Sequence, residues 1–477
     1  MFKNIQEMLE YVHRENVEII DFKVTDMQGT WHRLSITRQK LKEDIMTKGI
    51  GFDGSSYGFT TVDKSDMAMV PDVTTCYIDP TKAVKTIACI ADIYTIENNR
   101  LVRYEDDPRY VAEKAEKLIL SSGIADEILL GPEFEFYVLD HVSFDISNNH
   151  MEVRLDSEQA EWNASRSDVQ NLGLHVRSHG AYHLDSPFDR AYDLRTETVL
   201  AAERIGVPVK YHHAENGGPG QCEIEVEFAS IREMGDRSMK LRHLLRNLAE
   251  KQGKVVTFMP KPFGSESGSG LHVHLLLKNK GQWIMYDKDG YSGLSQTALY
   301  MIGGLLTHAK SLCAITNPST NSYKRLVPGF EAPVTIGYAT SNRSAVIRIP
   351  GYAVDETEKR FEYRSPDATS NPYLAYAALM LAAYDGIKNK IDPSGNGFGP
   401  FDFNLYDLSK EDQARIKGLP TSIPEAFAAL KEDRDYLLKE GVFSAKYLES
   451  LEKRLMQEHS KIQRTPHPLE FDYYFNR

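Results

Sequence analysis

Five segments of the sequence place charged or imidazole side chains within an otherwise apolar strand, four of them at alternate positions and the fifth as a single arginine. They are residues 128–139, 221–228, 271–277, 345–350 and 361–365. Side chains two positions apart in a strand point to the same face, so Glu133 and Glu135 share one face of the first segment. One such strand commonly turns its polar face to water. Five of them, carrying carboxylates, imidazoles and guanidiniums, predict the lining of a shared polar cavity.

The polar residues of this cavity indicate a metal site. In the other four segments they are Glu223, Glu225, Glu227, His272, His274, Arg348, Glu362 and Arg364. Carboxylates that face each other in a cavity raise one another's pKa unless a cation neutralises them. Oxygen ligands with an occasional imidazole suit Mg²⁺ or Mn²⁺, whereas Zn²⁺ prefers Cys and His. The sequence has neither HExxH nor clustered cysteines, so we expect Mg²⁺ or Mn²⁺ and no zinc.

Arginines beside such a site point to phosphate, because a guanidinium binds phosphoryl oxygens in pairs while metal ions neutralise developing charge. The sequence lacks GxxxxGK[ST], so the chain is no P-loop enzyme. Two glycine-rich pieces, residues 217–220 and 264–270, each precede a cavity-facing strand. They are either turns or places where the backbone approaches a ligand closely. The pattern alone predicts a metal-assisted phosphoryl-transfer enzyme without naming its substrate.

Length and charge limit the classes of protein. A chain of 477 residues exceeds the roughly 250–300 residues of a single core, so at least two domains are expected. A net charge of −12 argues against nucleic-acid and anionic-membrane partners. The longest apolar run, residues 374–384, is far shorter than the about 20 residues that span a bilayer, and the N-terminus carries no signal-peptide pattern.

The four cysteines are spread along the chain without CxxC spacing. They are Cys76, Cys89, Cys222 and Cys313. This usage suits a reducing cytosol, so we expect a cytoplasmic protein.

A small α+β domain is predicted to precede the elements that position the cavity in the chain. Its predicted elements are a helix at residues 5–15 and strands at 17–24, 31–36, 75–78 and 85–94, with a hairpin turn at 27–30. Asp107 and Pro108 form a helix cap and first turn, opening a helix that ends near Gly123. We therefore divide the chain into domains 1–104 and 105–477. Further helices are expected from Asn371-Pro372 to Ile387 and from Pro424.

Six motifs resemble those of the glutamine synthetases. They are FDGSS at 52–56, PEFE at 132–135, GSGLHVH at 268–274, NPSTNSYKRLVPGFEAP at 317–333, NRSA at 342–345 followed by Arg348, and EYRSPD at 362–367. The resemblance covers essentially the whole chain in the family's order and fits the bacterial and archaeal type I enzymes. It implies an α+β fold with a small N-terminal β-grasp-like domain and a large catalytic α/β domain, whose curved antiparallel sheet lines the active site.

The activity implied by this resemblance is the ATP-dependent ligation of ammonium to the side-chain carboxylate of glutamate. An acyl-phosphate intermediate gives glutamine, ADP and phosphate. Two to three Mg²⁺ or Mn²⁺ ions are implied per site. Glu135, Glu215 and Glu223 would hold the first and Glu133, His272 and Glu362 the second, while a third would arrive with ATP.

The resemblance also assigns substrate contacts. Arg325 and Arg364 would bind glutamate, with Ser267 and Gly268 beside it. Arg343 and Arg348 would face the transferring phosphoryl group, with Arg343 catalytic, and ATP would also contact His274.

An ammonium pocket would combine Asp53 and Ser56 with Tyr182, Glu215 and Glu331. Asp53 or Glu331 would take the proton, and Glu331 would lie on a flap that excludes water. The family joins the N-terminal domain of one subunit to the large domain of its neighbour, so we expect a homo-oligomer, a dodecamer of two stacked hexamers.

Several positions depart from the family pattern. Ser267 stands where relatives usually carry an Asn, Leu276 replaces a Ser, and Ser341 replaces an Arg. The stretch 212–215 is one residue longer than the usual His-His-Glu, and a lysine expected after Arg348 has Lys359 or Arg360 as its nearest substitute. The departures concern the glutamate and ATP contacts and leave the metal ligands and the ammonium pocket intact.

Three functions therefore remain in view: glutamine synthetase, a related ligase that joins glutamate to a larger amine, and a non-catalytic structural or regulatory relative. Ser267 and the divergent stretch 150–178 motivate the second, while the intact metal ligands argue against the third. Tyr406 resembles a loop tyrosine that some relatives adenylylate, or is an ordinary loop residue. Thr61 stands where glutamine-inhibited relatives carry a basic residue, which disfavours that feedback.

Overall fold

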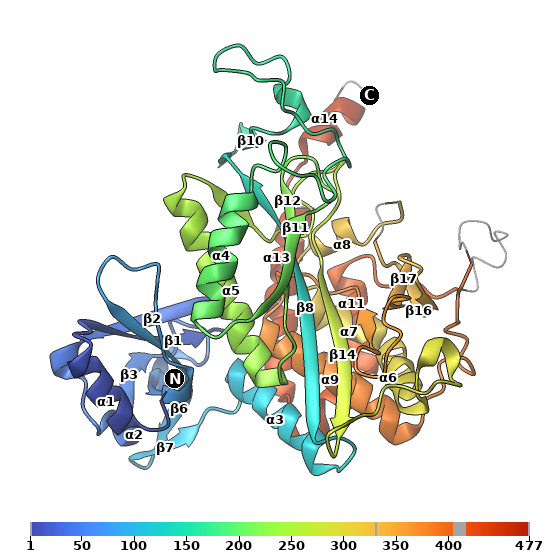
Figure 1. The fold of residues 1–477 in the computed structure, drawn as a ribbon. Helices are drawn as coiled ribbons and strands as arrows, with labels where there is room; N and C mark the ends of the chain where they lie inside the picture. The colour runs from blue at the N-terminus through green and yellow to red at the C-terminus, as the bar shows by residue number, and fades with distance from the viewer. Residues whose placement is uncertain (1, 330–331, 404–415, 476–477) are drawn as a thin grey trace.

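The N-terminal part of the molecule is built on a seven-stranded sheet (Figure 1). The computed structural model describes residues 2–329, 332–403 and 416–475. The strand order is β2-β1-β6-β4-β3, with β5 and β7 also pairing with β6, and β1 runs parallel to β6. The bounds are α1 Ile5–Arg14, β1 Ile19–Thr25, β2 Trp31–Thr37, α2 Ile45–Lys48, β3 Ile50–Asp53, β4 Asp66–Pro71, β5 Tyr77–Ile78, β6 Thr86–Glu97 and β7 Arg100–Arg103.

Local sequence explains the first helix. The Asn4 side chain accepts a hydrogen bond from the Glu7 amide (3.0 Å), and Met8 and Val12 pack into the core. The predicted helix and the β1–β2 hairpin are confirmed. The strand predicted at 75–78 is wrong in part, because residues 73–75 form a 3₁₀ turn and only Tyr77–Ile78 pair with β6.

Two cysteines of this sheet are bonded. Cys76 and Cys89 form a disulfide. Tyr77 on β5 pairs with Ala88 on β6, which brings the preceding and following cysteines opposite each other. Their separation along the chain hid this contact, so the cysteine spacing did not predict the disulfide; Cys222 and Cys313 are free and buried.

The larger part is a nine-stranded sheet in the order β11-β12-β8-β14-β18-β17-β16, with β13 on β8 and β15 on β14. Every pair is antiparallel except β16–β17, which is parallel. The bounds are β8 Glu127–Leu139, β11 Val209–Ala214, β12 Gln221–Val226, β13 Val255–Thr257, β14 Leu271–Asn279, β15 Gln282–Trp283, β16 Thr335–Thr340, β17 Ala345–Ile349 and β18 Phe361–Tyr363. A separate hairpin, β9 His141–Ile146 with β10 Met151–Asp156, projects with exposed side chains.

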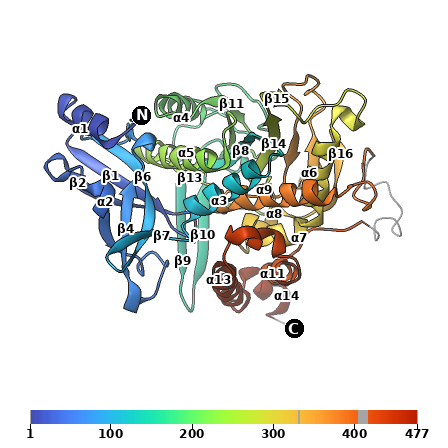
Figure 2. The same ribbon diagram turned by 90° about the horizontal axis from the view of Figure 1, so that it is seen from below.

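Helices cover this sheet, and α3, α5 and α9 lie side by side (Figure 2). The bounds are α3 Pro108–Ser121, α4 Tyr192–Arg204, α5 Ile231–Lys251, α6 Gln296–Thr307, α7 Ala309–Thr316, α8 Ser322–Arg325, α9 Pro372–Asn389, α11 Ile423–Glu432, α12 Asp435–Leu438, α13 Ala445–Gln463 and α14 Pro468–Tyr474. As predicted, Asp107 caps α3 and Asn371 caps α9, each before a proline.

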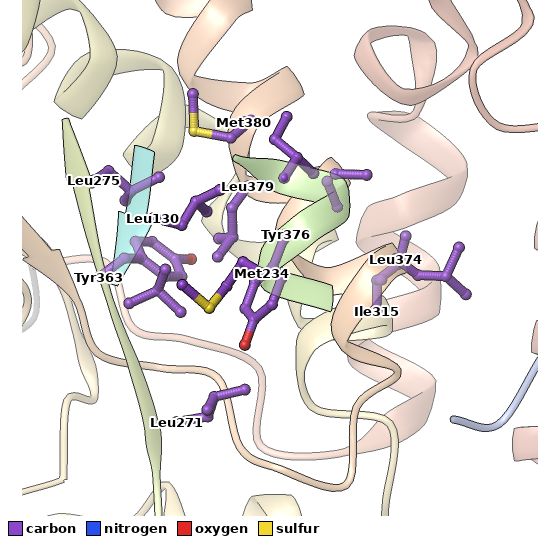
Figure 3. Close-up of a cluster of buried hydrophobic side chains, with 14 of the residues drawn as sticks. Leu130, Met234, Leu271, Leu275, Ile315, Tyr363, Leu374, Tyr376, Leu379 and Met380 are labelled. Atoms are coloured by element: carbon purple, nitrogen blue, oxygen red, sulfur yellow. The ribbon is translucent and has the colours of Figure 1, made fainter. Parts of the chain in front are cut away.

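The core lies between α9 and the sheet. In Figure 3, Leu130 of β8 and Leu275 of β14 meet Tyr376 and Leu379 of α9. The apolar run that is too short for a membrane is therefore a buried helix. Among the described helices, no single one is long and apolar enough to span a membrane; the α6–α7 pair reaches that length only together and is bent by 73°.

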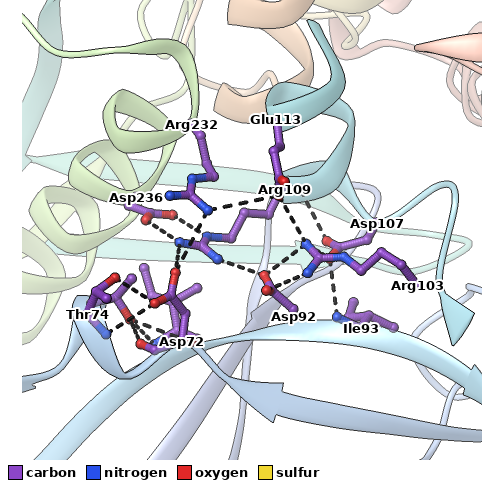
Figure 4. A network of polar contacts seen from close by, with 12 residues as sticks. Asp72, Thr74, Asp92, Ile93, Arg103, Asp107, Arg109, Glu113, Arg232 and Asp236 are labelled. Atoms are coloured by element: carbon purple, nitrogen blue, oxygen red, sulfur yellow. Dashed lines mark hydrogen bonds and ion pairs between the residues drawn. The ribbon is translucent and has the colours of Figure 1, made fainter. Parts of the chain in front are cut away.

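An ion-pair network joins the N-terminal sheet to helices α3 and α5 of the larger part (Figure 4). The buried Arg109 of α3 donates to Asp92 (2.7 Å) and Asp72 (2.8 Å) of the N-terminal part and to Asp236 of α5 (2.9 Å). Removing Arg109 would leave Asp72, Asp92 and Asp236 without this shared counter-charge.

Candidate active site

The charged segments meet in one cavity. Strands β12, β8, β14, β18 and β17 are neighbours in the sheet, and their polar faces line a cavity of about 1080 Å³. The register places His272 beside Glu133, Glu223 beside Glu135, and Arg348 beside Glu362. The predicted shared polar cavity is confirmed, except that Glu225 and His274 are fully buried and are not among its described lining residues.

Three buried residues that line the cavity form a candidate metal site. Ligand atoms of Glu133, His272 and Glu362 all lie within 4.8 Å of one another. The His272 Nδ1 atom is 3.0 Å from Glu133 Oε2 and 3.3 Å from Glu362 Oε1. Two carboxylates and one imidazole fit a hard divalent cation such as Mg²⁺ or Mn²⁺. This is the second predicted ligand set.

The electrostatics of the site also favour a cation. Burial raises the pKa of Glu223 well above its usual value, and the neighbouring carboxylates Glu133 and Glu135 raise it further. For Glu133, burial opposes ionisation, but hydrogen bonds with His272 and His274 outweigh it and hold its pKa well below the usual value. A bound cation would relieve the repulsion among these carboxylates.

A second group lies next to the first. Ligand atoms of His213, Glu215 and Glu223 also lie within 4.8 Å of one another, with His213 3.6 Å from Glu215 and 3.5 Å from Glu223. The predicted set has Glu135 in place of His213. Glu135 faces Glu223 across the sheet, and one of its carboxylate oxygens accepts the Gly270 amide (2.7 Å). His213 was missed, although it lies near the end of β11, only two positions before Glu215.

A third group of potential metal ligands includes His274, which the resemblance assigned to ATP binding. Its Nε2 is 2.8 Å from Glu133 Oε1, and ligand atoms of Glu133, Glu225 and His274 lie within 4.8 Å of one another. Lys210 donates to Glu225 (2.9 Å). His274 is fully buried behind the cavity.

Arginines border the carboxylates. Arg348 and Arg364 donate to the two oxygens of Glu362, each at 2.9 Å. Arg325 donates to the carbonyls of Ser365 (2.8 Å) and Arg364 (3.0 Å), and burial lowers the pKa of its guanidinium. Arg343 lines the same cavity. Positive and negative walls thus face each other, as binding of a metal together with phosphoryl or carboxylate groups requires.

The loop at 267–270 packs against these arginines. A Cβ atom at Gly268 would lie 2.7 Å from Arg325 Cγ, and one at Gly270 would lie 2.4 Å from Arg325 Nη2. Glycine is therefore needed for close approach to Arg325. The Asn216 amide donates to the Ser267 hydroxyl (2.8 Å), and both side chains line the cavity. Asn216 was not predicted from the sequence. Its side-chain amide lies beside Ser267, which stands where relatives usually carry an Asn.

The predicted ammonium pocket is divided. Tyr182 and Glu215 line the cavity, but Asp53 and Ser56 are not among its described lining residues. Asp53 lies on the N-terminal sheet, where hydrogen bonds with Ser55 and Ser56 lower its pKa to about 2. Glu331 and Tyr406 lie outside the described residues.

Comparison with known proteins agrees with this geometry. Residues 105–474 match the protein-family model for the glutamine synthetase catalytic domain, and residues 16–96 match that for the glutamine synthetase beta-Grasp domain. The glutamine synthetases of Nostoc sp. and Streptomyces filamentosus are each 42% identical, covering 99% and 100% of both chains respectively. A Plasmodium falciparum glutamine synthetase structure superposes with a TM-score of 0.89 at 25% identity, covering 99% of both chains.

Proposed function

The chain belongs to the glutamine synthetase family, and on that premise we propose how its residues carry out the reaction. It is an ATP-dependent ligase that forms glutamine from glutamate and ammonium. The observation that carries the assignment of residues is the buried Glu133–His272–Glu362 group with Arg348 and Arg364 on its rim.

Divalent cations, Mg²⁺ or Mn²⁺, neutralise phosphoryl charge when bound. We assign one to Glu133, His272 and Glu362. A second belongs to Glu215 and Glu223, with Glu135 or His213 completing the set. The close contacts among these ligands support the assignment. A third ion would enter with ATP.

The arginines hold the anionic substrates. Arg325 and Arg364 orient the carboxylates of glutamate, aided by Ser267, Gly268 and Asn216. Arg343 and Arg348 stabilise the phosphoryl group as it passes from ATP to the side-chain carboxylate, while the buried His274 supports Glu133. Phosphorylation turns a poor leaving group into phosphate, and closing the site to water protects the acyl-phosphate from hydrolysis.

The ammonium pocket joins two subunits. Tyr182, Glu215 and Glu331 of one subunit would meet Asp53 and Ser56 of its neighbour, and Asp53 or Glu331 would take a proton so that the free amine attacks the acyl-phosphate. The absence of Asp53 from the described lining of its own chain's cavity supports this arrangement. We therefore propose a ring, a dodecamer, with domains 1–104 and 105–477.

Location and further partners are proposals as well. We propose a cytoplasmic protein with small-molecule substrates and neither nucleic-acid nor membrane partners. The acidic charge and the two free, buried cysteines support this proposal. Cys76 and Cys89 do not support it, because they form a disulfide.

Phosphate release from ATP tests the function. With glutamate and Mg²⁺ or Mn²⁺, release should depend on ammonium, and kcat/KM for ammonium should exceed that for every member of a panel of alkylamines and polyamines. A higher kcat/KM for a larger amine would favour the alternative ligase instead. Asn216 weighs against that alternative, because it supplies an amide next to Ser267.

A further inference from the structure

Two arginines of α5 face a cleft away from the catalytic cavity. Arg242 and Arg246 stand one helical turn apart, on the same face of α5. The cleft has a volume of about 300 Å³ and shares no lining residue with the catalytic cavity. Its other polar lining residues are Thr257, Ser319, Asn321 and Thr369.

Arg242 is buried without a counter-charge among the residues that the structure describes. Arg242 is only 8% exposed, and its Nε atom has no hydrogen-bond partner among the described residues. Both guanidiniums lie near the Phe258 ring, 5.6 Å and 5.4 Å from its centroid, and no described carboxylate forms an ion pair with either. Burial and then the charge of Arg246 lower the pKa of Arg242 to about 10, so it remains charged at neutral pH.

Two other buried arginines of the chain are paired with carboxylates. Arg109 donates to Asp236 at 2.9 Å, and Arg195 donates to Asp189 at 2.9 Å. A buried charge without a partner is costly, and the cost is removed by a counter-ion with good hydrogen-bonding geometry. Two adjacent guanidiniums offer several N–H donors to such an ion.

We propose that this cleft binds a small anion through phosphoryl or carboxylate oxygens, held by Arg242 and Arg246 against Phe258. The Thr257 hydroxyl accepts the Met259 amide (3.1 Å) and keeps its proton to donate to the anion. Pro260 lines the cleft, and its carbonyl accepts the Ser269 amide (2.8 Å) in the loop beside the catalytic cavity. An occupant therefore contacts the segment that holds this loop.

Thermal melting of the assembled protein tests the site independently of activity. Inorganic phosphate and succinate are titrated separately, in EDTA and at ionic strength matched with chloride. At saturation, one or both should raise the Tm by about 2 °C or more. Arg242→Met should lose this shift, Arg242→Lys should keep part of it, and the exposed control Arg204→Met should keep all of it. The anion that gives the larger shift identifies phosphoryl or carboxylate as the preferred group.

Two results overturn the proposal. One is an equal shift in the wild-type protein and Arg242→Met with both anions. The other is loss of the native assembly in Arg242→Met by light scattering, because the arginines would then bind a carboxylate of a second copy. An unchanged or raised Tm of folded Arg242→Met in anion-free buffer supports the proposal, because the variant no longer buries an unpaired charge.

Discussion

His272 and Glu133 face each other across the β8–β14 pair, with 3.0 Å between Nδ1 and Oε2. Glu362 completes the group from β18, the next strand. The proposed metal site is thus built on the register of three neighbouring strands. Strands within a sheet are rigid supports, which suits a site whose ligands must hold a fixed geometry.

Replacing one ligand tests this group. We expect Glu133→Gln to lower kcat by at least about 100-fold and to weaken Mn²⁺ binding, because the variant removes one anionic ligand. Calorimetric Mn²⁺ titration and turnover are the measurements. Glu127→Gln, at the exposed start of the same strand, should leave both unchanged. Unchanged Mn²⁺ affinity and stoichiometry in folded Glu133→Gln would remove this residue from the metal site.

The Asn216–Ser267 pair tests the glutamate contacts. Asn216→Val removes the amide and should raise the KM for glutamate by about 10-fold, with a smaller effect on kcat, since one charged hydrogen bond is worth about 1.5–3 kcal/mol. Ser267→Asn should restore much of the loss in the double variant. Steady-state kinetics at saturating ATP and ammonium measure this. If the effects of the two substitutions on the KM for glutamate were additive in the double variant, the two side chains would act separately.

Mixing subunits tests whether the site is shared. Asp53→Ala and Glu133→Gln should each be inactive alone. Co-expressed in equal amounts, they should give about a quarter of wild-type activity, because a quarter of random interfaces combine two intact halves. Activity and light scattering are measured on the same rings. Mixed rings as inactive as either variant alone would place Asp53 and Glu133 in the same subunit's site.

His308 gives a pH-dependent contribution to stability. Burial opposes its protonation, but hydrogen bonds with Asp385 and Asp433 outweigh it and raise its pKa to about 8 from 6.5. The stability is thus fully present below pH 6.5 and is lost as pH rises through 8, a change of about 2 kcal/mol. Urea unfolding at pH 6 and pH 9 should show this loss in the wild-type protein and a smaller one in His308→Gln. Equal losses in both would contradict the assignment.

The alternation of polar and apolar residues predicted the cavity well, because side chains two positions apart in a strand point to the same face. Glu133, Glu223, His272 and Glu362 all met where the pattern placed them. The family, the fold class and the activity are confirmed, while the roles of the site residues and the domain limits stay predictions. Asn216 was missed because its partner Ser267 comes from a distant loop. His213 was missed although Glu215, two positions after it, belongs to the same group. The Cys76–Cys89 bond was missed because it depends on the pairing of β5 with β6.

Formation of labelled glutamine tests the central claim most directly. With ¹⁵N-ammonium, glutamate, ATP and Mg²⁺ or Mn²⁺, the purified protein should form glutamine labelled in the side-chain amide, with one ADP and one phosphate per glutamine. ATP hydrolysis without labelled glutamine, or preferential coupling of an added alkylamine, would contradict glutamine synthesis as its activity.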